Sequence, residues 1–247
     1  MTTLSGKSVL ITGGKRMGAG IAQALARQGA DVALTWHTSR AEADEAASVV
    51  RAAGRRALSI KADLSSAQGC DLAVAEVEQA FGRLDALVHL ASVYKAIPFD
   101  DLTPEAGDAQ MAVDLRSTFL CARSAVPAMR KVGGGRIIAF ADWVAASGRP
   151  RYPGYLPYYV AKAGVIALVE ALALELAADN ILVNAVAPGP ILPPDDLTAD
   201  ERRAVEAATP LGRWGGTEEI VKAVLFFLET GFVTGEVVRV DGGRHIR

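Results

Sequence analysis

The stretch SVLITGGKRMGAG, from Ser8 to Gly20, decides the fold of this chain of 247 residues. An apolar run (8–12) leads directly into a glycine-rich turn, and an alanine-rich helical pattern follows the turn. Glycines at such a point allow a tight turn and let phosphate oxygens approach the backbone at a helix N-terminus. An ordinary strand–helix turn can also need glycine for its backbone angles. The position between the first strand and the first helix nevertheless favours nucleotide binding.

The same alternation of strand and helix continues to the end of the chain. Further apolar runs favour strands at 31–36, 57–62, 84–90, 135–141, 181–187 and 236–240. Nearly continuous hydrophobic strands are typical of a parallel sheet that is covered on both faces. Helical patterns separate the strands, at 18–28, 40–54, 72–82, 104–132, 160–177 and 217–229. The sequence therefore predicts an α/β fold, a doubly wound (Rossmann-type) parallel sheet of about seven strands with helices on both faces.

Nothing in the sequence marks a second domain, so we expect residues 1–247 to form a single domain. There is no internal repeat, low-complexity linker or shift in composition along the chain. The region 188–216 is the one long irregular insertion, and we expect it to be a substrate loop. Cys70 and Cys121 lie far apart in the sequence, without a CxxC motif or a disulfide spacing, and we expect no metal site.

Composition excludes several classes of protein. The net charge is −2 and 51% of the residues are hydrophobic, so nothing indicates a surface for nucleic acid or anionic membranes. The first residues lack the basic start and apolar core of a signal peptide, and no uncharged apolar run is long enough to span a membrane. We therefore expect a cytoplasmic protein that acts on a small molecule.

Tyr158 and Lys162 are the candidate catalytic pair. Lys162 lies in the helical run 160–177, and Tyr158 stands four residues before it. On one continuous helix both side chains would therefore lie on the same face. A free phenol is a poor acid or base near neutrality, and an adjacent ammonium brings its pKa closer to working pH. The alternative is that the two residues are chance neighbours on the surface.

The end of the second strand indicates which dinucleotide binds. NAD-binding folds usually carry an acidic residue there for the ribose hydroxyls, and this chain has none between Thr35 and Arg40. Cationic and hydroxyl donors suit the additional phosphate of NADP, which a carboxylate would repel. The sequence therefore predicts NADP, bound through Lys15, Arg16, His37, Ser39 and Arg40. The alternative is that His37 and Arg40 only cap the next helix and face solvent.

Taken together, the motifs resemble the short-chain dehydrogenase/reductase family along essentially the whole chain. They are the first turn, Asp63-Leu64, Ala91-Ser92, the Tyr158–Lys162 pair, and the segments 184–189 and 233–243. The resemblance implies that Tyr158 exchanges the proton, while Lys162 holds the nicotinamide ribose and lowers the pKa of Tyr158. It also implies a homotetramer. The cofactor contacts that it implies, beyond those of the second strand, are Gly13, Lys15, Arg16, Met17, Asp63, Leu64, Ala91, Ser92, Tyr158, Lys162, Pro188, Gly189 and Ile191.

Departures from the family pattern make the chain similar to the pteridine reductase and dihydromonapterin reductase branch. Arg16 stands where most members have glycine, and Asp142 stands where most have the serine that orients the substrate carbonyl. Tyr94 matches an aromatic residue that stacks on the pterin. The resemblance therefore implies substrate contacts from Arg16, Tyr94 and Asp142. The alternatives are that Asp142 caps a helix or turn and that Tyr94 is an ordinary loop aromatic.

Two further departures concern the proton path. Asp114 stands where the family usually has an asparagine, either as a buried structural acceptor or as a proton relay. The segment from Asp142 to Tyr158 is also three residues longer than usual, which reshapes the substrate pocket. Tyr155 has the usual spacing from Asp142, but only Tyr158 is followed by a lysine four residues later. We therefore predict Tyr158 as the proton donor.

These inferences combine into a predicted reaction. NADPH delivers hydride to a C=N or C=O group, and Tyr158 supplies the proton. Because an ionised aspartate only accepts hydrogen bonds, Asp142 favours a substrate with N–H donors, such as a dihydropterin. The alternative is a general carbonyl or 3-oxoacyl-type reductase. A non-catalytic NADP-binding sensor is a remoter alternative, because such proteins generally lack the Tyr–Lys pair.

Overall fold

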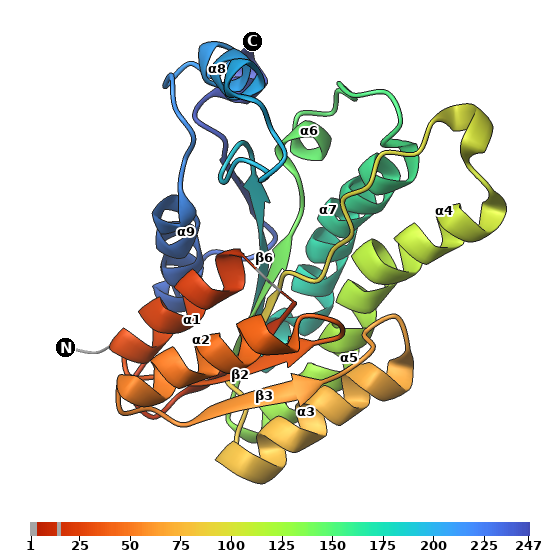
Figure 1. The fold of residues 1–247 in the computed structure, drawn as a ribbon. Helices are drawn as coiled ribbons and strands as arrows, with labels where there is room; N and C mark the ends of the chain where they lie inside the picture. Colours follow the sequence, from red (N-terminus) through yellow and green to blue (C-terminus); the bar gives the residue numbers. More distant parts are fainter. Residues whose placement is uncertain (1–3, 14–15) are drawn as a thin grey trace.

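The computed structural model describes residues 4–13 and 16–247. A parallel sheet of seven strands runs through the centre, in the order β3-β2-β1-β4-β5-β6-β7 (Figure 1). The predicted sheet is confirmed. The strand order reverses between β1 and β4, and ligands of such sheets bind beyond the carboxyl ends of the strands at that point. The strands are β1 (Ser8–Thr12), β2 (Asp31–Trp36), β3 (Ala57–Lys61), β4 (Ala86–His89), β5 (Gly135–Phe140), β6 (Ile181–Pro188) and β7 (Val237–Val240).

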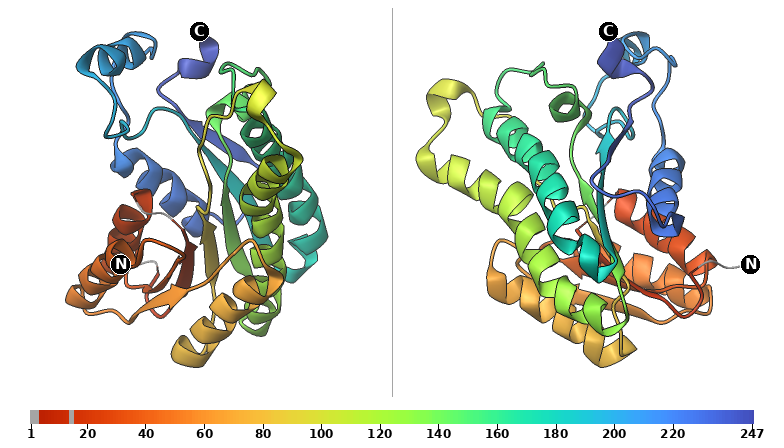
Figure 2. Two further views of the ribbon diagram at one scale, coloured as in Figure 1. Left: turned by 45° about the vertical axis from the view of Figure 1, so that its right-hand side comes forward. Right: turned by 180° about the vertical axis from the view of Figure 1, so that it is seen from behind.

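Two layers of helices cover the sheet, one on each face (Figure 2). Side chains of successive strand residues point to opposite faces, so Leu10 packs in one core and its neighbours Val9 and Ile11 pack in the other. One layer consists of α1 (Met17–Arg27), α2 (Arg40–Ala52) and α9 (Thr217–Glu229); the other consists of α3 (Ala67–Phe81), α5 (Ser117–Lys131) and α7 (Leu156–Leu176).

The helix predicted over 104–132 is interrupted. It consists of α4 (Pro104–Met111), a π-helical turn η2 (Ala112–Arg116) and α5. A π-helical turn adds a residue to the helical repeat and is frequent at functional sites. In this chain the turn holds Asp114, which is fully buried beside the carboxyl end of the sheet.

The region 188–216 is less irregular than expected, because it contains α8 (Ala199–Ala207). Thr198 and Glu201 form a capping box at its start. The Thr198 hydroxyl accepts the backbone N–H of Glu201 at 3.2 Å, and the Glu201 carboxylate accepts the backbone N–H of Thr198 at 2.8 Å. This Thr-x-x-Glu pattern was the available sequence signal for the helix.

The short helical elements lie mainly around the carboxyl edge of the sheet. They are η1 (Phe99–Asp101), α6 (Trp143–Ala146), η3 (Ala177–Asp179) and η4 (Arg244–Ile246). Across residues 4–13 and 16–247, no helix is both long and apolar enough to cross a bilayer. The same ranges contain no cluster of three or more His, Cys, Asp or Glu side chains that could hold a metal ion.

The two cysteines are distant in sequence and adjacent in space. Cys70 on α3 and Cys121 on α5 are both buried, and their Sγ atoms are 3.2 Å apart as free thiols. Sequence spacing alone could not indicate this contact, because the packing of α3 against α5 creates it.

Candidate active site

The carboxyl edge of the sheet holds a cavity of about 520 Å³, between the ends of β4, β5 and β6 and the start of α7. Residues from distant parts of the sequence meet there because parallel strands all end at the same edge. The sequence-predicted site residues that line this cavity are Arg16, Met17, Ser92, Tyr94, Asp142, Tyr158, Lys162, Pro188, Gly189 and Ile191.

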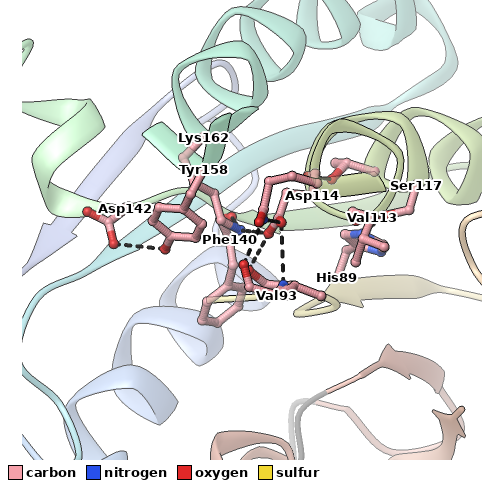
Figure 3. A network of polar contacts seen from close by, with 12 residues as sticks. His89, Val93, Val113, Asp114, Ser117, Phe140, Asp142, Tyr158 and Lys162 are labelled. Atoms are coloured by element: carbon pink, nitrogen blue, oxygen red, sulfur yellow. Dashed lines mark hydrogen bonds and ion pairs between the residues drawn. The ribbon is translucent and has the colours of Figure 1, made fainter. Parts of the chain in front are cut away.

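Asp142 and Tyr158 form a direct hydrogen bond in the cavity (Figure 3). The Tyr158 hydroxyl donates to Oδ2 of Asp142 at 3.0 Å. The other carboxyl oxygen, Oδ1, accepts the backbone N–H of Val144 at 2.7 Å and so caps α6. Asp142 therefore fills the helix-capping role given above as an alternative, and it also contacts the predicted proton donor.

Burial is the main influence on the acidity of both groups. Burial raises the pKa of the Asp142 carboxyl above its usual value, and it raises the pKa of Tyr158 well above the value of a free phenol, with the Asp142 charge adding to the effect. The expectation that Lys162 lowers the pKa of Tyr158 stays a prediction, and burial and the Asp142 charge act in the opposite direction. Tyr158 is held as the protonated phenol, the form that can donate a proton.

Lys162 is oriented by other partners. Its ammonium donates to the carbonyl oxygen of Phe140 at 2.9 Å and lies 3.3 Å from Oδ1 of Asp114, while the centroid of the Tyr158 ring is 5.7 Å away. The side chains of Lys162 and Asp114 are only 3% and 0% exposed. Burial lowers the pKa of Lys162, and the negative charge of Asp114 acts in the opposite direction and raises it. The ion pair with Asp114 thus favours the charged form of a buried lysine.

Asp114 accepts hydrogen bonds on both of its carboxyl oxygens (Figure 3). Oδ1 faces the Ser92 hydroxyl and the Lys162 ammonium; Oδ2 faces the side-chain amide of Gln110 and, at 3.4 Å, the backbone N–H of Val93. All four partners are donors in these contacts, and the amide group of an asparagine could accept on one side only. This explains a carboxylate where the family usually has an amide, and it supports the structural-acceptor alternative.

His89 is a buried structural residue at the end of β4. One ring nitrogen lies 2.6 Å from the Thr12 hydroxyl and the other lies 2.9 Å from the Ser117 hydroxyl. Burial, followed by the charge of Lys162, lowers the pKa of His89 to about 3. The imidazole is therefore neutral near pH 7 and connects β1, β4 and α5.

Aromatic side chains line one wall of the cavity. Tyr94 stacks on Tyr155 with ring centroids 4.5 Å apart, and it meets the edge of Tyr158 at 4.9 Å. Tyr152 and Tyr155 come from the longer segment before α7, and both line this pocket; that the additional residues reshape it stays a prediction. Tyr158, rather than Tyr155, is hydrogen-bonded to Asp142.

The first turn approaches the same cavity from β1. The backbone N–H of Gly13 donates to the Thr35 hydroxyl at 3.1 Å, and the Arg16 guanidinium donates to the carbonyl oxygen of Pro193 at 2.5 Å. Arg16 thereby connects the start of α1 to the loop after β6. Lys15, which was predicted to contact the cofactor, lies outside the described residues.

The residues predicted to contact the adenosine half lie along the same edge, outside the large cavity. Arg40 is exposed, its Nε is 3.3 Å from the Asp44 carboxylate, and His37 is exposed as well. Ser39 lines a small pocket together with Gly13 and Thr35. Hydrogen bonds from the Ser65 hydroxyl and backbone lower the pKa of Asp63, and Leu64 and Ala91 pack against the core.

Several residues of the site were not found as site residues from the sequence. Tyr152 and Arg244 line the cavity, and Gln110 holds Asp114. Trp143 and Trp214 line it too. The sequence carries no periodic signal for such contacts, because they depend on how loops fold over the sheet.

Comparisons with known proteins agree with this geometry. A sequence model of the family described as "Enoyl-(Acyl carrier protein) reductase" matches residues 14–245. The chain is 33% identical to L-rhamnose 1-dehydrogenase (NAD(P)(+)) of Sphingomonas sp. (strain SKA58), over 100% of this chain and 99% of that protein. It is 32% identical to a 3-oxoacyl-(acyl-carrier-protein) reductase of Staphylococcus aureus (strain Mu50 / ATCC 700699), over 97% of this chain and 98% of that protein.

Solved structures give the same result. A short chain dehydrogenase from Burkholderia cenocepacia J2315 in complex with NADP has a TM-score of 0.91 and 33% identity, and the match covers 98% of this chain and 99% of that one. The predicted likeness to the pteridine reductase branch is not shown by these relatives and stays a prediction. From the family match, the relatives and the seven-stranded fold, the chain belongs to the short-chain dehydrogenase/reductase family and is an oxidoreductase of that family.

Proposed function

We propose that this protein is an NADPH-dependent reductase that adds hydride to a C=O or C=N group of a small molecule. The observation that carries the proposal is the meeting of Tyr158, Asp142 and Lys162 in one cavity at the carboxyl edge of the sheet. The preference for NADP is supported by the lack of an acidic residue at the end of β2. It is also supported by the NADP complex of the Burkholderia relative and by the NAD(P) use of the rhamnose dehydrogenase.

The residues at the cavity fit a nicotinamide nucleotide. The Lys162 ammonium has three N–H bonds, and two of them are accounted for by Phe140 and Asp114. The third is available to a ribose hydroxyl at the cavity. Gly189 lines the cavity and packs closely against Asp241, since a Cβ atom at this position would lie 2.5 Å from Cβ of Asp241. Met17, Pro188 and Ile191 add apolar surface for a flat ring. When bound, NADPH supplies the hydride.

The chain itself supplies the proton. Tyr158 is protonated in this site, so it can donate to the oxygen or nitrogen that gains negative charge. Asp142 accepts from the Tyr158 hydroxyl and thereby fixes its orientation in the cavity. Lys162 provides a buried positive charge beside the ring of Tyr158, which stabilises the phenolate left after the transfer. Asp114 holds Lys162 in place through the ion pair.

For the substrate, we propose a flat heterocycle with N–H donors, such as a dihydropterin. Asp142, at the aromatic wall, can accept from such donors in its ionised form, and Tyr94 offers a ring for stacking, although Tyr155 covers one side of it. A 3-oxoacyl or other carbonyl substrate is the second candidate, favoured by the Staphylococcus aureus relative. Steady-state kinetics of Asp142→Ser on dihydropterins and small ketones separates the two. Loss of pterin turnover with unchanged ketone turnover supports the first candidate, and ketone turnover without any pterin reduction by the wild type refutes it.

Substitution of two neighbouring tyrosines tests the proton donor. We expect Tyr158→Phe to lower the NADPH oxidation rate by roughly 10² to 10⁴, the usual contribution of a positioned general acid, with little change in NADPH affinity. Tyr155→Phe is the matched control, because it removes a hydroxyl from the same wall. If Tyr155→Phe abolished turnover and Tyr158→Phe did not, the assignment would be wrong.

We also propose a homo-oligomer, a tetramer by family resemblance. Val160 and Leu174 on α7 and Phe119 on α5 are apolar side chains exposed by 48%, 82% and 44%. Apolar surface of this kind is typical of helices that pack against a second copy. Light scattering coupled to size-exclusion chromatography measures the assembly, and a monomer at micromolar concentration would contradict it. A cytoplasmic location stays a prediction.

A further inference from the structure

Arg244, three residues before the last residue of the chain, connects three separate walls of the substrate cavity. Its guanidinium donates to the carbonyl oxygen of Val205 on α8 at 2.9 Å and to the hydroxyl of Thr209 at 3.2 Å. Its other terminal nitrogen donates to the hydroxyl of Tyr152 at 3.3 Å. The guanidinium carbon also lies 5.5 Å from the centroid of the Trp143 ring. Through these contacts the C-terminal segment is fixed as one side of the cavity.

Arg244 has no carboxylate partner among the residues that the structure describes. Among residues 4–13 and 16–247, no carboxylate lies within ion-pair distance of it, whereas the equally cavity-lining Lys162 is paired with Asp114. A guanidinium has five N–H bonds, and neutral oxygens engage three of them. Two N–H bonds and a full charge are therefore available in a partly enclosed cavity.

The location of this charge relates it to the substrate rather than to the dinucleotide. Arg244 contacts Trp143, the residue after Asp142, and Tyr152 of the aromatic wall. Of the residues that fit the nicotinamide, Met17 belongs to α1 and Gly189 directly follows β6. A planar guanidinium with two available N–H bonds matches the geometry of a carboxylate.

We infer that Arg244 is a specificity-determining residue that binds a carboxylate on the substrate, so that the preferred substrates carry a reducible C=O or C=N group and a separate carboxylate. The inference rests on the proposed reductase function. It predicts that this cavity distinguishes an acid from its neutral ester. The C-terminal segment is thus part of the substrate site as well as a support for α8.

The test compares matched ligands on the holoenzyme. One pair is 4-acetylbenzoate and its methyl ester; the second is a dihydropterin with a 6-carboxylate and the same ring with a 6-methyl group. KM and kcat are measured for each, and binding to the NADP⁺ complex is measured by calorimetry, which needs no turnover. We expect the wild type to prefer the carboxylate in at least one pair by roughly 10-fold or more, the magnitude of a charge-assisted hydrogen bond.

Two variants separate carboxylate recognition from support of the fold. Arg244→Met removes the charge, and we expect it to abolish the preference for the carboxylate, because kcat/KM and affinity fall more for the carboxylate ligand than for its neutral counterpart. Arg247→Met is the matched control, because Arg247 also anchors the C-terminal segment to α8, by a 2.8 Å bond to the carbonyl oxygen of Ala207, without lining the cavity. It should keep the preference.

The outcomes are distinct for the two proposals. If no ligand is reduced but Arg244→Met abolishes selective binding of a carboxylate, the reductase proposal fails and the inference on Arg244 stands. If the wild type binds acid and neutral ligand equally, or shows a preference that survives Arg244→Met, the inference is overturned. A parallel loss for both members of each pair in Arg244→Met would likewise overturn it, because that result indicates a purely structural contact.

Discussion

Replacing Asp114 with asparagine tests the reasoning on the buried ion pair most directly. The change keeps the size and shape of the side chain, removes the negative charge and gives one side of the group donors in place of acceptors. In the structure, Asp114 is fully buried and faces the Lys162 ammonium at 3.3 Å together with three further donors. The variant would leave a buried ammonium without its counter-charge and at least one donor without an acceptor.

The expected magnitude follows from that geometry. Removal of one partner from a buried ion pair costs about 3–5 kcal/mol of the free energy of unfolding. For a chain of this size, 1 kcal/mol corresponds to roughly 2–4 °C in Tm, so we expect a decrease of roughly 6–20 °C. Urea denaturation at pH 7, followed by tryptophan fluorescence at a fixed protein concentration and without cofactor, measures the change in the free energy of unfolding.

A control and a second variant make the result specific. Asp108→Asn removes the same charge from an exposed position on α4, and we expect it to change stability by less than about 0.5 kcal/mol. Adding Lys162→Met to Asp114→Asn removes the unpaired ammonium, so the double variant should be less destabilised than the sum of the single variants. Stability of Asp114→Asn within about 0.5 kcal/mol of the wild type would refute the argument.

Three further predictions concern single side chains. Burial raises the pKa of Asp142, so ionisation of this carboxyl opposes folding. We therefore expect the stability of Asp142→Asn to increase relative to the wild type as pH rises above 3.8, and a pH-independent difference in urea unfolding would contradict this. The pKa of His89 is lowered from 6.5 to about 3, so between these pH values the unfolded chain binds a proton on this imidazole and the folded chain does not. As pH decreases from 6.5 to about 3, the free energy of unfolding of the wild type should decrease by up to about 1.4 kcal/mol per pH unit relative to His89→Gln, and parallel stability curves would disprove this prediction. Arg40→Asp should weaken NADPH binding by about 1–3 kcal/mol in calorimetry and spare NADH, and an equal effect on both would be against a contact with the 2′-phosphate.

The sequence by itself determined the layers of the fold and the edge at which the site lies. The apolar runs from Ser8 to Val240 are continuous and short, and helical patterns separate them, so a covered parallel sheet was the consistent arrangement. The pair Tyr158 and Lys162 could be placed on one helix face because spacing within a helix is a local property. The glycine-rich turn could be placed in the same way, because it directly follows β1 in the sequence.

Only the tertiary structure decided what these residues contact. Lys162 pairs with Asp114, and Asp142 both caps α6 and accepts from Tyr158, so burial and a neighbouring carboxylate raise the pKa of Tyr158. Such effects depend on desolvation, which arises when distant segments pack together and which no local pattern records. The place of Arg244 in the cavity has the same origin, because a loop, α8 and the C-terminal segment meet there only after the sheet has formed.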